Sequence, residues 1–403
     1  MDDHPRAAQF APAEQALLAA VERDAPEALE LARWMAAHPE LSLEERETSQ
    51  RYRAFLAARG FAIETGVAGL ETAFVARRGR GDAPVAAALL AEMDALPEIG
   101  HACGHNLSGP ASLLAAAALA AVLPTDAARI EVVGCPAEEL GIGKRRLVRA
   151  GVFAAIDAAL MAHASDMRRA HRLFLGNRKF EFVFHGRAAH AAAYPERGIN
   201  ALDGVIGSFV AVGLLRQQLA SGVRIHGIVT DGGRAPNVIP ERAAARFWVR
   251  ALDEAVLDAA AARLVDCAEG AARACGARLE VSEEENSSPP LRVNLPLAGL
   301  YRQQLERLGL VETPHAPQQA IGSSDITHVS RVVPTIHPNF PIGERLELHT
   351  RDFAAATTSR EGLAGLLEAA RALALTVLAL ARDPAARAAV AAARAETGPP
   401  GER

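Results

Sequence analysis

In one short stretch of the chain, from Ala91 to Leu107, two carboxylates, two imidazoles and a thiol could act together. These groups belong to Glu92, Asp94, His101, Cys103 and His105. An apolar run, 84–90, precedes the stretch and predicts a buried strand, and the prolines and glycines that follow predict a loop. Thiolates and imidazoles are preferred ligands of zinc and related metals, so the stretch predicts a metal site. The alternative is a buried cysteine with two hydrogen-bonded histidines.

Two further apolar runs end in polar residues in the same way. Run 130–133 leads to Glu138 and Glu139, and run 158–161 leads to His163. Because the carboxyl ends of strands in an open α/β sheet lie at one edge, we expect these side chains to share a crevice with the first stretch. Each residue alone could be a loop residue in solvent. Polar residues follow three apolar strands in the same way, and this repetition favours a single site.

The adjacent acids Glu138 and Glu139 are suited to two different tasks. Neighbouring side chains diverge, so Glu139 can bind a metal while Glu138 faces the substrate as general base for a metal-activated water. The alternative is a solvated acidic pair at the start of the basic helix that begins near Lys144, where the helix dipole favours negative charge.

Two histidines far apart in the sequence extend the set of ligand types. His163 follows an apolar run, and His349, in Glu-Leu-His-Thr, is expected at another strand end after the chain has returned. With Cys103, His105 and Glu139 they make five ligands, which is too many for one tetrahedral zinc and suits two metals that share a ligand. The cysteine favours zinc, whereas carboxylate and histidine ligands also accept manganese or cobalt.

The length of 403 residues predicts two domains. From residue 178 to 287 the elements follow the order β-α-β-β-α-β, which predicts an inserted ferredoxin-like domain. Residues 1–177 and 288–403 then form a discontinuous α/β catalytic domain with a mixed sheet. Within the insertion, His190 follows a strand and Asn237 lies on a loop between two prolines. The amide on this rigid loop suits a substrate contact, although a plain turn is the alternative, and His190 could be a surface loop histidine.

Charge and cysteine content limit the choice of partner and compartment. The net charge of -5 gives no reason to expect nucleic acid or an anionic membrane as a partner, and four cysteines are too few for a disulfide scaffold. The acidic start lacks the features of a signal peptide, and charged residues interrupt the alanine-rich runs. We therefore expect a cytoplasmic protein with reduced thiols. The Ala- and Arg-rich tail after Asp383 is expected to fray at its end.

Over nearly its whole length the chain resembles the dinuclear metallopeptidase family of aminoacylase, carboxypeptidase G and hippuricase. It is most similar to the branch of aminobenzoyl-glutamate hydrolase and β-alanyl-lysine dipeptidase. The motifs behind the resemblance are Glu-Met-Asp-Ala-Leu-Pro at 92–97, His-Ala-Cys-Gly-His-Asn at 101–106, Pro-Ala-Glu-Glu at 136–139, His163, His190 with Pro195, Gly198, Asn200, Ala201 and Leu202, Ala-Pro-Asn-Val-Ile-Pro at 235–240, and His349.

The resemblance implies two divalent metal ions and a smaller lid domain that also makes a homodimer. It implies Glu138 as general base, and His190 and Asn237 as groups that polarise the scissile carbonyl or bind substrate. The implied metal ligands are Cys103, His105, Glu139, His163 and His349. Hippuricase-like members carry Asp where this chain has Asn106, which favours the dipeptidase-like branch. Glu92 stands where other metallopeptidases carry a ligating His, so Glu92 is expected to be structural or to support the ligands.

The resulting hypothesis is a metal-dependent hydrolase that cleaves the amide bond of a small N-acyl amino acid or unusual dipeptide. Glu138 takes the proton of the attacking water, and Asp94 orients a metal ligand. One alternative is a metal-dependent deaminase of a small amine, which would release ammonia instead of an amino acid. Another is a metal-free binding protein on the same fold, which metal content would exclude.

Overall fold

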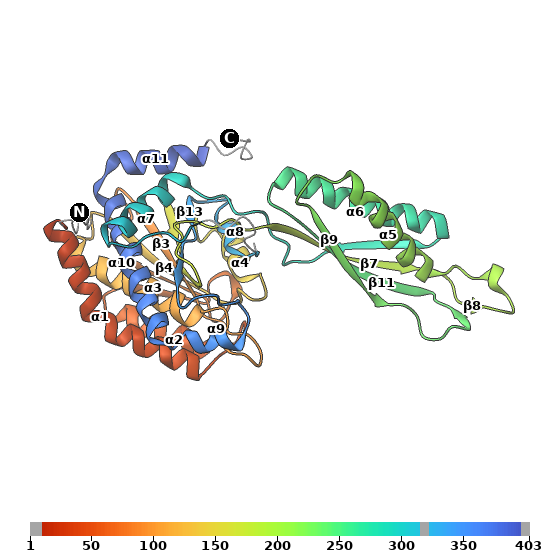
Figure 1. Cartoon of the computed structure of the whole chain (residues 1–403), viewed down its shortest axis with the longest axis horizontal. Helices are drawn as coiled ribbons and strands as arrows, with labels where there is room; N and C mark the ends of the chain where they lie inside the picture. Colours follow the sequence, from red (N-terminus) through yellow and green to blue (C-terminus); the bar gives the residue numbers. More distant parts are fainter. Residues whose placement is uncertain (1–9, 315–321, 396–403) are drawn as a thin grey trace, which may run out of the picture. The chain divides into compact units, whose positions relative to one another are not determined.

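The computed structural model describes residues 10–314 and 322–395, and these form two compact units. The first unit contains residues 10–172, 292–314 and 328–395, and the second contains 173–291 and 322–327. Figure 1 shows an α/β arrangement in the first unit and a sheet with two long helices in the second. The first unit is therefore built from segments on both sides of an insertion.

A mixed sheet forms the centre of the first unit, with strand order β1-β2-β4-β3-β5-β13. The strands are β1 (Ala62–Thr65), β2 (Phe74–Arg78), β3 (Ala86–Glu92), β4 (Arg129–Cys135), β5 (Ala158–Leu160) and β13 (Thr335–Ile336). Strand β3 pairs in parallel with both β4 and β5, whereas β2 pairs antiparallel with β4. Every residue of β3 is buried, as its continuous apolar sequence predicts. The mixed sheet predicted for the catalytic domain is thus confirmed.

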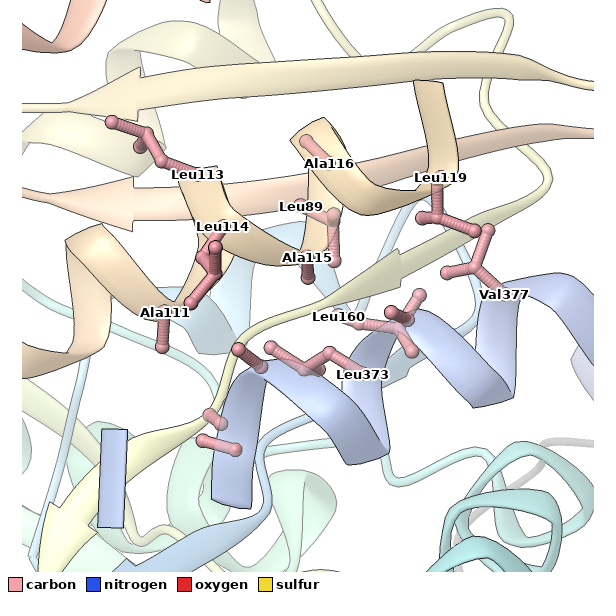
Figure 2. Close-up of a cluster of buried hydrophobic side chains, with 14 of the residues drawn as sticks. Leu89, Ala111, Leu113, Leu114, Ala115, Ala116, Leu119, Leu160, Leu373 and Val377 are labelled. Atoms are coloured by element: carbon pink, nitrogen blue, oxygen red, sulfur yellow. The ribbon is translucent and has the colours of Figure 1, made fainter. Parts of the chain in front are cut away.

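Helices cover this sheet and bury an alanine-rich core. They are α1 (Pro12–Ala37), α2 (Arg46–Ala57), α3 (His105–Val122), α4 (Gly143–Arg149), α7 (Leu295–Arg307), α9 (Arg351–Ala356), α10 (Arg360–Arg382) and α11 (Pro384–Ala395), and α8 (Ile326–Val329) lies where the chain passes between the units. Figure 2 shows leucine and alanine side chains of α3 and α10 in one cluster with Leu89 and Leu160 of the sheet. Each fully buried leucine contributes about 1.5–3 kcal/mol to stability.

Two core helices are long and apolar enough to cross a membrane by length and composition alone. Of the most apolar 18-residue stretch of each helix, 89% is buried inside the protein in α3 and 67% in α10. Burial of this extent is typical of core helices, and α3 in particular has almost no outer face. Small alanine side chains allow α3 to pack closely against α1 and α10.

One strand of the first unit differs from the sequence prediction. His163 does not end the strand that begins at Ala158; it begins a separate strand, β6 (His163–Ser165), which pairs in parallel with β14 (Asn339–Pro341). The tail after Asp383 forms α11, because alanine and arginine are strong helix formers and nothing interrupts them. Residues 396–403, where fraying was predicted, lie outside the described residues.

The second unit is a four-stranded antiparallel sheet packed against α5 (Ala201–Leu215) and α6 (Glu254–Cys275). Its strands, in the order β12-β7-β11-β9, are β12 (Arg278–Glu283), β7 (Gly176–His185), β11 (Arg242–Ala251) and β9 (Arg224–Asp231). Phe182, Phe184 and Phe247 fill the core between sheet and helices. The first and third of these strands along the sequence lie in the middle of the sheet, which is the ferredoxin-like arrangement that was predicted.

Candidate metal centre

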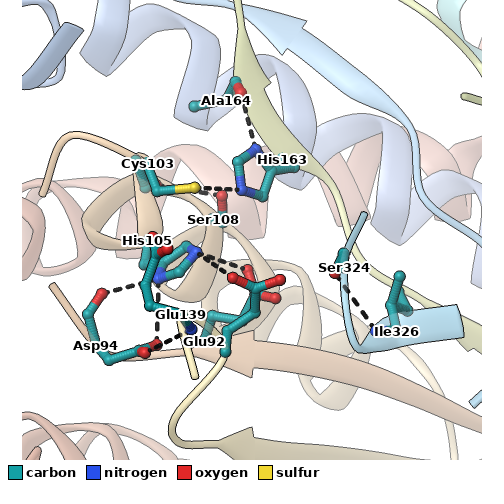
Figure 3. A network of polar contacts seen from close by, with 12 residues as sticks. Glu92, Asp94, Cys103, His105, Ser108, Glu139, His163, Ala164, Ser324 and Ile326 are labelled. Atoms are coloured by element: carbon teal, nitrogen blue, oxygen red, sulfur yellow. Dashed lines mark hydrogen bonds and ion pairs between the residues drawn. The ribbon is translucent and has the colours of Figure 1, made fainter. Parts of the chain in front are cut away.

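The ring of His105 is oriented by the end of strand β3. His105 is the first residue of α3, after Gly104, whose φ of 86° lets the chain turn sharply into the helix. Its Nδ1–H donates a hydrogen bond of 2.8 Å to the carbonyl oxygen of Asp94 (Figure 3). Because a carbonyl can only accept, the proton of the neutral imidazole lies on Nδ1. The lone pair on Nε2 is therefore available to a metal, in the arrangement common for ligating histidines.

His163 shows the same arrangement on strand β6. Its Nδ1–H donates to the carbonyl oxygen of Ala164 at 2.8 Å, and its Nε2 lies 3.5 Å from the Sγ of Cys103. Figure 3 shows the two histidines and Cys103 converging from different elements. The ring of His337 stacks on that of His163 with centroids 5.3 Å apart. A thiol and two imidazole lone pairs thus face a common point.

The two acids after strand β4 diverge, as expected for neighbours. The backbone N–H of Glu139 donates to Asp94 Oδ2 at 2.9 Å, and Glu139 Oε2 lies 3.6 Å from His349 Nε2. Glu138 Oε2 lies instead 3.8 Å from His105 Nε2. The loop is held by the buried carboxylate of Glu45, which accepts the N–H of Ala137 at 2.9 Å. Ala137 has a φ of 56°, a left-handed conformation that an alanine rarely adopts.

The structure brings the five predicted ligands into one cluster. Donor atoms of Cys103, His105 and His163 lie within 4.8 Å of one another, and so do those of Cys103, His105, Glu138 and Glu139. His349 joins the cluster through Glu139. The prediction that His349 follows a strand is wrong: it lies in a turn before α9 with a φ of 63°, and its N–H donates to the carbonyl of Ala102.

The spacing of these donor atoms fits divalent metal ions, and so does the lack of hydrogen-bond partners at several of them. Ligands of one tetrahedral ion, bound at about 2.0–2.3 Å, lie about 3.3–3.7 Å apart. The separations of 3.5 Å between Cys103 and His163 and of 3.6 Å between Glu139 and His349 match this spacing. Several buried polar atoms also have no hydrogen-bond partner, which is costly without a cation. They include Glu92 Oε2, Asp94 Oδ1, His105 Nε2 and Glu139 Oε1.

Burial and neighbouring charges oppose one another in the cluster. Burial would lower the pKa of His105, but the carboxylate of Glu92 holds this pKa well above its ordinary value. Burial raises the pKa of the Cys103 thiol well above its ordinary value and lowers the pKa of His163 to about 4. Burial would also raise the pKa of Glu92, but the ammonium of Lys144, followed by His105, holds this pKa below its usual range. The Lys144 Nζ lies 2.6 Å from Glu92 Oε1, and both side chains are fully buried.

Sequence reasoning missed three residues of this neighbourhood: Lys144, Glu45 and His337. Only Lys144 could have been noticed from composition, because Lys144 and Lys179 are the only lysines among 43 basic residues. Glu45 and His337 lie in segments without any ligand pattern. Their positions follow from tertiary contacts alone.

His190 and Asn237 belong to the second unit, where the structure places them side by side. His190 in β8 (Ala189–His190) pairs with Val238 in β10 (Val238–Ile239), and the N–H of Ala191 donates to the Asn237 carbonyl at 3.0 Å. The His190 Nδ1 accepts the N–H of Ala193 at 3.1 Å, so a neutral ring carries its proton on Nε2. Both residues are exposed, and Nε2 can donate to a ligand.

Known proteins resemble the chain in both units. A family model described as a peptidase dimerisation domain matches residues 175–274. The chain is 35% identical over 372 residues to the Xaa-Arg dipeptidase of Mus musculus, covering 89% of this chain and 86% of that protein. It is 33% identical over 274 residues to a p-aminobenzoyl-glutamate hydrolase polypeptide of Escherichia coli (strain K12), covering 63% of this chain and 56% of that protein.

A solved structure shows the same fold. It is the crystal structure of a dinuclear metal binding peptidase from the M20 family of Bacillus subtilis, with a TM-score of 0.68 and 22% identity. The match covers 89% of this chain and 99% of that chain. The fold of this chain therefore recurs in a solved protein.

We expect Cys103→Ala and His163→Ala to lose bound metal, because each removes one of the donors that converge on the cluster. Elemental analysis of the purified variants measures this. Cys135→Ala is the matched control, since Cys135 is a second buried cysteine whose thiol donates to the carbonyl of Val133. Full metal occupancy in both test variants would show that these side chains are not ligands.

Metal uptake is expected to release protons and to strengthen as the pH rises. With its pKa raised by burial, the Cys103 thiol is protonated at neutral pH until a metal displaces the proton. His163, whose pKa is lowered to about 4, is already neutral and releases none. Calorimetry in buffers of different ionisation enthalpy counts the protons, and Cys103→Ala is expected to release about one fewer than the wild type. An unchanged count would contradict a thiolate ligand.

Proposed function

The chain belongs to the M20 family of metallopeptidases, and we propose that it holds two divalent metal ions and hydrolyses the amide bond of a small N-acyl amino acid or dipeptide. The observation behind this proposal is the divergence of Glu138 and Glu139. Glu139 contacts Asp94 through its backbone and His349 through its side chain. Glu138 points instead toward His105. A ligand and a general base are thereby supplied by adjacent residues.

The chain's own residues would divide the chemistry as follows. Bound metal ions supply Lewis acidity and lower the pKa of water. The ligands are Cys103, His105, Glu139, His163 and His349. Glu138, whose side chain is 11% exposed, can reach both solvent and the cluster, so it takes the proton of the attacking water and returns it to the leaving amine. Asp94 holds the ring of His105. The cysteine ligand favours zinc, with manganese and cobalt as the other candidates.

The substrate class follows from the relatives. They are named Xaa-Arg dipeptidase, p-aminobenzoyl-glutamate hydrolase and N-acetyl-L-cysteine deacetylase. Each of these names describes an amide whose nitrogen belongs to an amino acid. A screen of dipeptides and N-acyl amino acids, with the released amino acid measured, tests the proposal for this chain. Release of ammonia without an amino acid would support a deaminase instead.

The second unit is proposed to be the lid and dimerisation domain, with the first unit as catalytic domain. Helix α5 presents an apolar stripe of Ile206, Val210 and Leu214, which are 52%, 58% and 73% exposed. Strand β9 is an edge strand among the described strands, so its outer side can pair with a second copy. A stripe of this kind at helical spacing on a peptidase dimerisation domain supports a second copy as the partner.

We also propose a cytoplasmic location, which is supported by the state of the cysteines. The four cysteines are free, and the proposed role of Cys103 requires a reduced thiol.

Glu138→Gln and Glu139→Gln are expected to separate the two roles of the acidic pair. Glu138→Gln keeps metal and fold but loses about 10²–10⁴-fold in kcat, because the amide cannot take a proton. Glu139→Gln weakens metal binding first, since it removes a charged ligand. Metal titration and steady-state kinetics on both variants measure the two effects. Normal turnover by Glu138→Gln would assign the base to another residue.

His190 is expected to act in the partner's site of the dimer. Its Nε2–H can stabilise the developing oxyanion, and loss of one such donor costs about 10²–10³-fold in kcat. His190→Ala is therefore nearly inactive with its metals retained. A mixed dimer of His190→Ala and Glu138→Gln chains regains activity, because one of its two sites combines an intact Glu138 with an intact His190.

The control for this experiment is Leu214→Asp, which places a charge on the α5 stripe. It is expected to give monomers by light scattering and to abolish the complementation. If exchanged subunits form mixed dimers that stay inactive, His190 does not act across the dimer.

A further inference from the structure

A fully buried ion pair lies beside the proposed metal centre. Lys144 in α4 and Glu92 at the end of β3 are 52 positions apart, and their side chains meet at 2.6 Å with no exposed surface. Taking two charges out of water costs about as much as their attraction returns, so such a pair adds little stability over an apolar pair. Its presence next to ligating side chains therefore calls for a role in the centre itself.

The choice of lysine at this position is informative. Of 43 basic residues, only Lys144 and Lys179 are lysines, so the chain otherwise uses arginine. A guanidinium binds both oxygens of a carboxylate as a fork, whereas an ammonium binds as a point charge. Lys144 contacts Glu92 Oε1, and Oε2 is left buried without a hydrogen-bond partner. A lysine thus neutralises Glu92 while one oxygen stays available.

That available oxygen faces the cluster. Glu92 Oε2 lies 3.3 Å from His105 Nε2, which is also buried without a hydrogen-bond partner. Because His105 donates through Nδ1 to Asp94, a neutral ring presents a lone pair to this carboxylate oxygen. The two atoms attract one another while a proton lies on Nε2, and a metal ion that replaces this proton would be bound by both of them. Their separation equals the edge of about 3.3 Å between two ligands of one tetrahedral ion.

Lys144 reaches Glu92 because the backbone at the start of α4 packs closely against the loop after β4. Gly143 is the first residue of α4, and a Cβ there would lie 1.7 Å from the carbonyl oxygen of Pro136. Helix α4 can therefore lie directly against the loop that carries Glu138 and Glu139. An oxygen of Glu138 also lies within 4.8 Å of one of Glu92.

We propose that Glu92 is a further donor of the metal centre through Oε2, and that Lys144 is the residue that positions it. This inference rests on the proposed metal centre. Lys144 holds the carboxylate in place and offsets its charge before a metal binds, so the metal-free chain does not contain an isolated buried anion. It also leaves Oε2 unshared, which arginine would not do.

The test is a metal titration of the chelator-stripped full chain. Zn²⁺ binding is measured against a competing chelating indicator, and Co²⁺ absorption reports the ligand set. Glu92→Gln is expected to change the ligand-field bands and to weaken one of the two binding steps by at least the roughly ten- to hundredfold that loss of an outer-shell partner costs. The thiolate-to-cobalt charge-transfer band from Cys103 persists. Lys179→Met, which alters the other lysine, is the control and titrates as the wild type.

A double variant separates positioning from a merely structural role. Glu92→Gln with Lys144→Met removes both charges together, so thermal stability stays near that of the wild type while metal binding stays weak. Lys144→Arg keeps the charge but is expected to weaken binding as well, because its fork takes both oxygens. Wild-type affinity and spectrum in the double variant would overturn the inference. A wild-type chain that binds no metal would overturn the proposed metal centre along with it.

Discussion

The cluster of donors depends on the hydrogen bonds that buried Asp94 accepts through its side chain and its backbone. Its Oδ2 accepts hydrogen bonds from the Ser42 hydroxyl at 2.7 Å and from the Glu139 N–H at 2.9 Å, and its carbonyl oxygen accepts the Nδ1–H of His105. One residue at the end of β3 thereby fixes a histidine ring, an acidic loop and the segment before α2. Burial alone would raise the pKa of Asp94, but the ring of His105, whose Nδ1 lies 3.3 Å from Asp94 Oδ1, keeps this pKa below its ordinary value.

The loops around Asp94 are held in unusual conformations by this network. Leu43, Ala137 and His349 all have positive φ, which costs free energy for residues with a side chain. Glu45 compensates by accepting the N–H groups of both Leu43 and Ala137 at 2.8 and 2.9 Å. The metal-binding side chains are thus in place before a metal ion binds. A preorganised centre of this kind loses little free energy to the ordering of side chains on binding.

The sequence predicted the parts of this arrangement that depend on local pattern. Apolar runs located the strands, and the parallel pairing of β3 with β4 and β5 brings Asp94, Glu139 and the segment before His163 to one edge of the sheet. Three features could not be predicted from local sequence pattern. The left-handed turn at His349, the pairing of β6 with β14 and the contact of Lys144 with Glu92 all join segments far apart in the chain. No periodicity encodes such contacts, because tertiary packing selects them.

The most direct measurement of the proposed centre is anomalous diffraction from crystals of the metal-loaded protein, recorded on both sides of the metal's absorption edge. We expect two anomalous peaks in each chain, enclosed by Cys103, His105, Glu139, His163 and His349. The absence of such peaks from this cluster, or metal bound only elsewhere on the chain, would contradict the proposed dinuclear centre and the hydrolysis assigned to it.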